Sequence, residues 1–290
     1  MAIFGQLTTK QKQVIGLFII IIVIIWIPAS ASTSQNLGVS FLNVGQGDAI
    51  FITAPNGNQM LIDGGPDSSV LAELGEQMKF SDRSIDVILA THADADHIGG
   101  LPDILAGYKI GTIITPCVPA DTGLYDEFET AVAGEPDVRT ICAQRGMRIM
   151  LDERAGVFAD ILFPDRDMSD VRDRNDSSII VKLTYGDIDF LFTGDASQTI
   201  ENYLSYIGSD DLDIEILKLG HHGSKTSTSD LFLQNTSPEM AVVSAGAGNR
   251  YGHPHDEVID ALTSRNIPSL STARDGQLEF QTDGLNWWIK

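Results

Sequence analysis

The chain has 290 residues, of which 43% are hydrophobic, and a formal net charge of −21 at pH 7. This length and apolar content suffice for one large globular domain or two small ones, and nothing in the composition indicates disorder. The acidic excess disfavours a surface that grips long nucleic acid through its phosphates. Seven Arg between residues 139 and 174 do not alter this, because seven Asp and Glu share the interval.

The N-terminal segment has the composition of a targeting sequence. Residues 14–27 carry no charge, follow Lys10 and Lys12, and precede a cleavage-like site of small residues at 29–31. As a helix this run covers about 21 Å, or about 27 Å up to residue 31, against a hydrocarbon core of about 30 Å. We therefore expect residues 1–31 to form one N-terminal hydrophobic helix, either a cleaved signal peptide or a single membrane anchor. Both alternatives make the remainder extracytoplasmic, either secreted or anchored to the cell membrane.

Strand and helix patterns then alternate through one predicted domain, residues 38–290, without an internal repeat or linker. Strands are expected at 39–44, 49–53, 59–62, 85–90, 110–114, near 138 and 148, and at 157–163, 179–183, 189–192, 214–219 and 240–244. Helices are expected at 69–80, 101–106, 125–133 and 196–207. Cys117 and Cys142 are an even pair, which fits one disulfide or two buried thiols.

Candidate metal ligands are concentrated directly after the predicted strand at 85–90. Two imidazoles and two carboxylates fall within six positions: His92, Asp94, Asp96 and His97. Alternation along an extended loop would bring His92, Asp94 and Asp96 together, and the second His would join them as a helix opens at Ile98. This mixture of oxygen and nitrogen donors suits zinc, manganese or iron, as one ion or two. The alternative is a polar turn whose Asp caps the next helix.

Further polar residues also follow predicted strands. All six histidines of the chain fall in three such clusters: His92 and His97, His221 and His222, and His253 and His255. Asp195 ends a Thr-Gly-Asp sequence after the strand at 189–192, where it is either a metal ligand or the cap of the next helix. The third cluster has a similar alternative, since His253 or His255 would also suit the start of a helix.

The sequence His92-x-Asp94-x-Asp96-His97 resembles the His-x-His-x-Asp-His metal motif of the metallo-β-lactamase superfamily, with Asp94 in place of the second His. That replacement is similar to the form in the extracellular hydrolase domain of ComEC-type competence proteins. The glycine-rich turn at residues 43–48 and the Leu-Ile-Asp-Gly-Gly-Pro sequence at 61–66 extend the resemblance, which covers residues 38–290. The fold it implies is α/β (α+β), a four-layer αββα sandwich with the site where strand ends from both halves meet.

The resemblance also implies roles for individual residues. The metal ligands it implies are His92, Asp94, Asp96, His97, Asp195 as a bridge between two ions, and one of His221 and His222. His222 is favoured because glycine follows it directly. Asp176 is the expected substitute where most members of the superfamily carry another His. Asp63 resembles an acid that orients metal ligands without binding the metal.

These assignments predict a metal-dependent hydrolase, a phosphodiesterase or nuclease with two divalent ions, zinc or manganese, that activate water. Asp96, His253 and His255 are the candidate catalytic residues, and one of the two histidines would protonate the leaving group or bind the anion. The expected substrate is a short or single-stranded DNA, a small phosphodiester, or a polymer delivered by a basic protein partner. The alternatives are a non-catalytic metal-binding module and a hydrolase of another ester or a β-lactam. With one apolar segment, transport of DNA through a channel is not implied.

Overall fold

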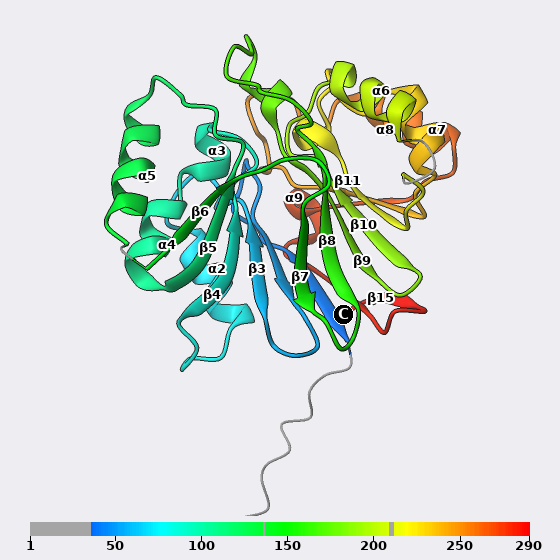
Figure 1. Cartoon of the computed structure of the whole chain (residues 1–290). Coiled ribbons are helices and arrows are strands. Elements are labelled where there is room, and N and C mark those ends of the chain that lie inside the picture. The colour runs from blue at the N-terminus through cyan, green and yellow to red at the C-terminus, as the bar shows by residue number, and fades with distance from the viewer. Residues whose placement is uncertain (1–35, 136, 209–211) are drawn as a thin grey trace, which may run out of the picture. The chain divides into compact units, whose positions relative to one another are not determined.

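Two mixed β-sheets face one another in the computed structural model, which describes residues 36–135, 137–208 and 212–290 (Figure 1). The first sheet has the strand order β15-β14-β1-β2-β3-β4-β5-β6. Its strands are β1 (Leu37–Phe41), β2 (Ile50–Thr53), β3 (Gln59–Ile62), β4 (Ser84–Leu89), β5 (Lys109–Thr115), β6 (Arg139–Cys142), β14 (Leu278–Thr282) and β15 (Trp287–Ile289). The second sheet has the order β13-β12-β11-β10-β9-β8-β7. Its strands are β7 (Arg148–Asp152), β8 (Val157–Phe163), β9 (Ile180–Tyr185), β10 (Ile188–Phe192), β11 (Ile216–Lys218), β12 (Met240–Val243) and β13 (Ser269–Ser271).

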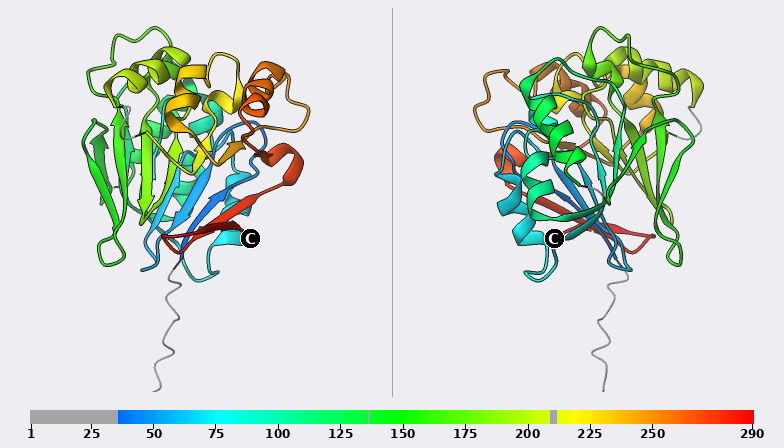
Figure 2. Two further views of the ribbon diagram at one scale, coloured as in Figure 1. Left: turned by 90° about the vertical axis from the view of Figure 1, so that its right-hand side faces the viewer. Right: turned by 60° about the vertical axis from the view of Figure 1, so that its left-hand side comes forward.

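Helices cover the outer faces of both sheets, as the two further views confirm (Figure 2). Over the first sheet lie α2 (Val70–Gln77), α3 (Ala95–Ile98), α4 (Leu101–Gly107) and α5 (Gly123–Ala133). Over the second lie α6 (Gln198–Ile207), α7 (Asp230–Thr236) and α8 (Asp256–Ser264). Three shorter elements are η1 (Arg174–Ser177), η3 (Gly220–Gly223) and α9 (Thr272–Asp275). The predicted α/β class and the arrangement of two sheets between helices are confirmed.

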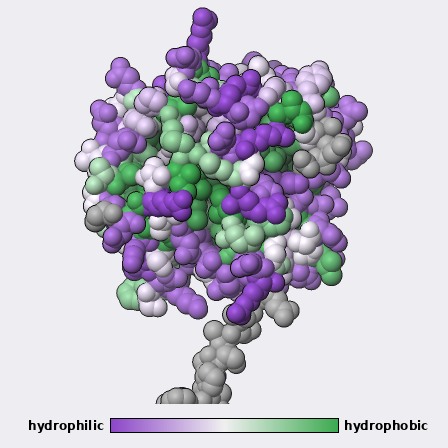
Figure 3. All heavy atoms as spheres, viewed as in Figure 1, coloured by the Kyte–Doolittle hydropathy of each residue, from purple (hydrophilic) through white to green (hydrophobic). Residues whose placement is uncertain are grey.

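The main core lies between the sheets, where large aromatic side chains are fully buried. Phe41 of β1 contacts Phe280 of β14 with ring centroids 5.6 Å apart, and Phe280 also meets Phe190 of β10 at 6.2 Å. Burying one such side chain is worth about 1.5–3 kcal/mol, so these rings hold the two halves together. The surface seen from the side of Figure 1 is mostly hydrophilic (Figure 3). Hydrophobic residues gather near its centre, where β6 and β7 are the edge strands of the two sheets.

The strand directions place the polar loops at one end of the sandwich. In the first sheet β3, β4 and β5 are parallel, and in the second β10, β11, β12 and β13 are parallel. The loops that follow β3, β4, β10 and β11 carry Asp63, His92, Asp195 and His222. Because ligands of α/β proteins bind beyond the carboxyl ends of parallel strands, this edge is where a site is expected.

Several element boundaries differ from the predictions. The strands at 59–62 and 157–163 have the expected bounds, but the helix expected to open at Ile98 begins at Ala95 as α3. After residue 244 the predicted feature was a helix that could begin at His253 or His255, and His255 does immediately precede α8. The chain then forms β13 and α9, which were not predicted, before β14 returns to pair antiparallel with β1. That return depends on a partner more than 230 residues away, which local patterns do not reveal.

The predicted N-terminal helix at 1–31 lies outside the described residues. Within the ranges given above, no helix is both long and apolar enough to cross a membrane. Cys117 and Cys142 form a disulfide that joins the loop after β5 to the end of β6, so the alternative of two free thiols is wrong.

Candidate metal centre

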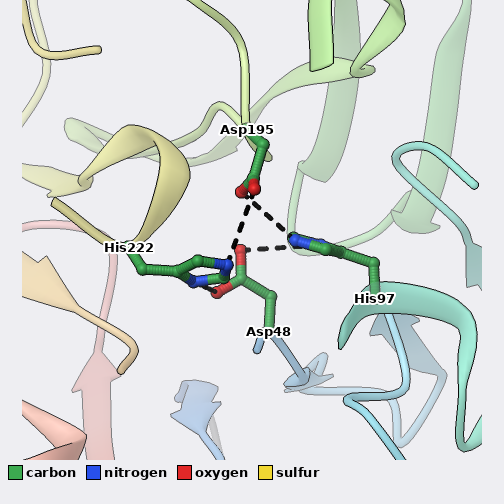
Figure 4. A group of neighbouring side chains, drawn as sticks. All are labelled: Asp48, His97, Asp195 and His222. Atoms are coloured by element: carbon green, nitrogen blue, oxygen red, sulfur yellow. Dashed lines mark ion pairs between the residues drawn. The ribbon is translucent and has the colours of Figure 1, made fainter. Parts of the chain in front are cut away.

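Four buried side chains from separate segments converge at the edge of the sandwich: Asp48, His97, Asp195 and His222 (Figure 4). Each offers a ligand atom that lies within 4.8 Å of those of the other three. Of the acidic, His and Cys side chains in the described residues, these four lie close enough together to hold a metal ion. Asp96 extends it, because its Oδ2 lies 3.2 Å from His222 Nε2.

His97 is oriented by a buried carboxylate. Its Nδ1 donates to Asp63 Oδ2 at 2.7 Å, while its Nε2 points to Asp195 Oδ1 at 3.2 Å. Asp63 also accepts from the backbone N–H and the hydroxyl of Thr91 at 2.7 and 2.8 Å. Asp63 therefore fixes both the tautomer and the direction of His97, as expected of an acid that supports a metal ligand.

The two ring nitrogens of His222 also have different surroundings: one is held by protein acceptors and the other faces the centre. Nδ1 donates to the backbone carbonyl of Ser244 at 2.9 Å and lies 3.3 Å from Asp48 Oδ1. Nε2 lies near two carboxylates, 3.2 Å from Asp96 and 3.5 Å from Asp195. The Nε2 atoms of His97 and His222 thus face the same space, next to Asp195.

Unsatisfied atoms line that space. His97 Nε2, His222 Nε2 and Asp195 Oδ1 are buried and make no hydrogen bond. A buried polar atom without a partner costs about 1–3 kcal/mol, so three of them together need an explanation. A divalent cation bound by the two imidazoles, Asp195 and Asp96 would satisfy all of them, and this donor set suits zinc or manganese. The residues present fit a metal ion.

Asp48 and Lys218 were missed as site residues by the sequence analysis. Asp48 contacts both histidines on their Nδ1 side, away from the unsatisfied Nε2 atoms. Its Oδ2, the oxygen nearer His97, also accepts from Lys218 Nζ, and both side chains are buried. Although Asp48 belongs to the compact group, we infer from this placement that it supports the centre from behind. The sequence signal that could have revealed Lys218 is its position in an apolar strand, shortly before His221 and His222.

The glycine-rich turn explains how Asp48 reaches the centre. Its backbone N–H donates to the carbonyl of Asp96 at 3.1 Å, so the turn packs directly against the metal loop. A Cβ atom at Gly47 would lie 2.2 Å from that carbonyl oxygen, and Gly47 has φ +139°. Only glycine allows this approach without a shift of the backbone.

The carboxylates and imidazoles of the centre shift one another's pKa strongly. Burial alone would lower the pKa of His222, but Asp195 and Asp48 raise it to about 9. Burial likewise opposes protonation of His97, yet Asp195 and Asp63 hold its pKa well above the usual range. The pKa of Asp195 is well below its usual value despite burial, because His222 and His97 are adjacent. In the metal-free protein, protons therefore occupy the positions that a cation would take.

Three residues at the centre have left-handed backbone conformations that favour glycine. Asp63 has φ 60°, and His221 and His222 have φ 48° and 56°. Such conformations cost of order 1 kcal/mol each for a side chain with Cβ and concentrate at functional sites. The turn through residues 220–223 uses this geometry to aim two adjacent imidazoles in different directions.

The expected convergence of His92, Asp94 and Asp96 is seen only in part, because Asp94 approaches His92 whereas Asp96 faces His222. Because α3 begins at Ala95, Asp96 lies on the helix with His97, and Asp94 precedes it. Asp94 Oδ1 instead accepts from Arg174 Nε at 2.7 Å, and its Oδ2 lies 3.9 Å from His92 Nε2. His92 packs beside His97 with ring centroids 4.2 Å apart, and burial lowers its pKa to about 4.

Asp176 is not part of the compact group. Its Oδ1 accepts from Ser197 Oγ at 2.5 Å, at the start of α6. The preceding Asn175 places its amide Nδ2 3.4 Å from His221 Nδ1. The short helix η1 turns both side chains toward the second half of the sandwich.

The other histidines form a rim around the centre. His221 Nε2 lies 3.6 Å from Asp195 Oδ2, and its ring is 5.5 Å from that of His253. His253 stacks on Tyr251, and burial together with His221 lowers its pKa to about 4, so its ring is neutral at pH 7. His255 immediately precedes α8, and its Nδ1 accepts from the backbone N–H of Lys225 at 3.1 Å.

Comparison with known proteins agrees with this arrangement. The family model described as the metallo-beta-lactamase superfamily matches residues 42–246, so the chain belongs to that superfamily. Within it, the chain resembles ComEC-type competence proteins. It is 30% identical to ComE operon protein 3 of Bacillus subtilis over 264 residues, which is 84% of this chain and 33% of that protein. It is 32% identical to Recombination protein 2 of Haemophilus influenzae over 247 residues, 83% of this chain and 28% of that protein. The chain thus spans about a third of the length of these relatives.

Solved structures share the fold at low identity. The metallo-beta-lactamase fold protein YhfI of Bacillus subtilis aligns with 81% of this chain and 96% of its own, at a TM-score of 0.54 and 12% identity. CmlA of Streptomyces venezuelae, described as a diiron beta-hydroxylase, aligns with 85% of this chain and 54% of its own, at a TM-score of 0.53 and 13% identity. Because a hydroxylase has this fold too, the fold alone does not define the reaction.

Proposed function

We propose that the protein is a metal-dependent hydrolase of phosphodiesters. The observation that carries the proposal is the set of buried, unsatisfied Nε2 and carboxylate atoms around Asp195, which are positioned for a cation. A divalent ion held there would supply a hydroxide nucleophile at neutral pH and neutralise charge on a phosphoryl group. The similarity to competence proteins supports a nucleic-acid substrate, and the acidic surface favours a short or single-stranded one.

In this proposal each residue of the centre has a separate role. Asp96, His97, Asp195 and His222 hold the ion, and Asp63, Asp48 and the Ser244 carbonyl keep the two imidazoles in place. His253 is neutral at pH 7 and lies at the open side of the centre. A neutral imidazole donates one hydrogen bond and accepts one, so His253 is better suited to orient substrate or water than to supply a proton as imidazolium.

The test is turnover by the full chain. We expect hydrolysis of bis-p-nitrophenyl phosphate and of single-stranded DNA with Mn²⁺ or Zn²⁺, and loss of both activities in Asp96→Ala. Asp103→Ala removes an exposed carboxylate from α4 and is the matched control. Metal binding without turnover of any phosphodiester would refute the proposal and leave a non-catalytic metal-binding module. Turnover of a β-lactam or thioester alone would point to another hydrolase of the superfamily.

We also propose that the domain acts outside the cytosol. The signal-like residues 1–31 support this, as does the disulfide between Cys117 and Cys142, since such bonds persist mainly in oxidising compartments. Cell fractionation and the mass of the mature protein test it. A full-length chain in the membrane would select the anchor, a shortened chain outside the membrane would select cleavage, and a full-length chain in the cytosol would contradict export.

A further inference from the structure

A guanidinium group lies beside the metal centre, on the far side of Asp94. Arg174 Nε donates to Asp94 Oδ1 at 2.7 Å, and Asp94 Oδ2 lies 3.9 Å from His92 Nε2, next to the His97 ring. The Arg174 side chain is 40% exposed and that of Asp94 30%, so this pair faces solvent at the edge of the site. Within the described chain, the two terminal nitrogens of Arg174 make no hydrogen bond.

Ligands for a second ion are too few at this position. His92 Nδ1 lies 3.1 Å from the Thr91 hydroxyl, whose proton goes to Asp63, so His92 Nε2 keeps its lone pair. Asp94 is the neighbouring carboxylate, but Asn175 and Asp176 bond elsewhere, to His221 and Ser197. Catalytic zinc sites ordinarily have three protein ligands, whereas His92, whose Nε2 is buried without a hydrogen bond, and Asp94 provide two. Asp195, the expected bridge, belongs to the compact group with His97 and His222, which includes neither of them.

We propose that the chain holds one tightly bound metal ion and that Arg174 takes the place of a second by binding a phosphoryl oxygen of the substrate. A guanidinium is planar, always charged, and matches the geometry of phosphate oxygens with two parallel N–H donors. Asp94 fixes Nε and leaves the two terminal nitrogens for the anion. The inference rests on the proposed function for its substrate class.

The charge around the site favours this role. The chain has 40 acidic and 19 basic residues, so an anionic substrate needs a local cation. Two other cations near the centre are already engaged. Lys218 is buried against Asp48, and Lys225 faces Glu257 at 3.9 Å. Arg174 lies at the solvent-exposed edge beside the ion-binding group, and its two terminal nitrogens are available to donate hydrogen bonds.

The number of bound ions tests the first half of the proposal. After the full chain is loaded with Mn²⁺ or Zn²⁺ and freed of excess ions by dialysis, native mass spectrometry should show one ion per chain. Arg174→Gln should keep that ion, and Asp195→Ala should lose it. Two tightly bound ions in the wild-type chain would overturn the proposal, as would loss of the ion in a folded Arg174→Gln protein.

Binding of inorganic phosphate tests the second half. Calorimetric titration of phosphate into the metal-loaded full chain should show affinity about 10- to 100-fold weaker in Arg174→Gln and partly restored in Arg174→Lys. Arg172→Gln, an exposed Arg two residues away, should bind phosphate like the wild type. Phosphate that does not bind the wild type, or binds Arg174→Gln equally well, would overturn the role of Arg174.

The steady-state constants separate this inference from the proposed function. Arg174→Gln should raise KM for bis-p-nitrophenyl phosphate about 10-fold or more, with an unchanged thermal unfolding midpoint. If Arg174→Gln turns over the substrate with an unchanged KM and binds phosphate with unchanged affinity, the inference is refuted and the proposed function is not. Arg174-dependent phosphate binding without phosphodiester turnover would refute the function and retain the anion site.

Discussion

The buried centre and the exposed rim use histidine in opposite ways. In the centre, His97 and His222 each have Nδ1 fixed by an oxygen acceptor and Nε2 left without a hydrogen bond beside a carboxylate. In the rim, His255 uses Nδ1 to accept a backbone N–H, and His253 stacks on Tyr251. The orienting acceptor, rather than the presence of an imidazole, therefore distinguishes His97 and His222 from His253 and His255 of the rim.

Removing the cation behind the centre should have the largest effect on stability. Lys218→Met leaves the buried carboxylate of Asp48 without its lysine, and breaking such a pair costs about 3–5 kcal/mol in the free energy of unfolding. Lys225→Met removes a rim cation that is 60% exposed and should change stability by less than about 0.5 kcal/mol. Urea unfolding of both variants makes the comparison. Equal destabilisation would mean that the buried pair contributes no more than a surface pair.

The loss of stability with rising pH should disappear when metal binds. The pKa of His222 is raised to about 9 in the metal-free fold, against an ordinary value of 6.5. Its contribution is therefore fully present below pH 6.5 and is lost as the pH rises through 9, a change of about 3 kcal/mol. A bound cation needs neutral imidazole, so the loaded protein should not lose stability over the same range. Urea titrations from pH 6 to 9.5, with chelator or with Mn²⁺, measure both slopes. Parallel slopes would show that His222 does not bind the ion.

The carboxylate behind His97 should matter less than the ligands themselves. Asp63→Asn leaves one oxygen where there were two, so the side chain cannot accept from the Thr91 backbone N–H and from His97 at once, and metal affinity should fall about 10- to 100-fold. Asp67→Asn, on an exposed loop nearby, should leave the affinity unchanged. Competition with a chelating dye gives both values. A wild-type affinity in Asp63→Asn would mean that packing alone orients His97.

The smallest effect is expected at the rim. His253→Gln keeps a polar side chain at the open side, so kcat should fall by less than about 10-fold, below the 10²–10⁴-fold typical of a general acid, and metal affinity should not change. Steady-state assays with bis-p-nitrophenyl phosphate and the dye competition provide the two numbers. A loss of kcat above 100-fold in His253→Gln would instead indicate that His253 donates the proton to the leaving group.

The sequence predicted the loops of the site better than the side chains that meet there. Strand patterns placed His97, Asp195 and His222 at strand ends, and parallel strands bring such ends to one edge. Asp48 was missed because a Gly-Asp turn is common and its Lys218 partner is 170 residues away. Asp96 was predicted on an extended loop, but it lies on α3, which begins three residues earlier than the pattern suggested. Tertiary partners of this kind leave no periodic signal in the chain.

The same limit applies to the C-terminal part of the fold. The strand β14 is short, and its place in the first sheet depends on pairing with β1 across the whole length of the domain. Phe280 joins the core between the sheets only because of that pairing. Local propensity cannot choose between the two sheets, whereas the mutual burial of aromatic rings can.

The most direct test of the centre is X-ray absorption spectroscopy on the full chain loaded with one equivalent of Zn²⁺. The account predicts a first coordination sphere with two imidazoles, those of His97 and His222, and oxygen ligands from Asp195 and Asp96. His222→Ala should reduce the imidazole count to one, and His253→Gln should leave it at two. Three or more imidazoles around the ion, or a count that falls in His253→Gln, would contradict the division between centre and rim.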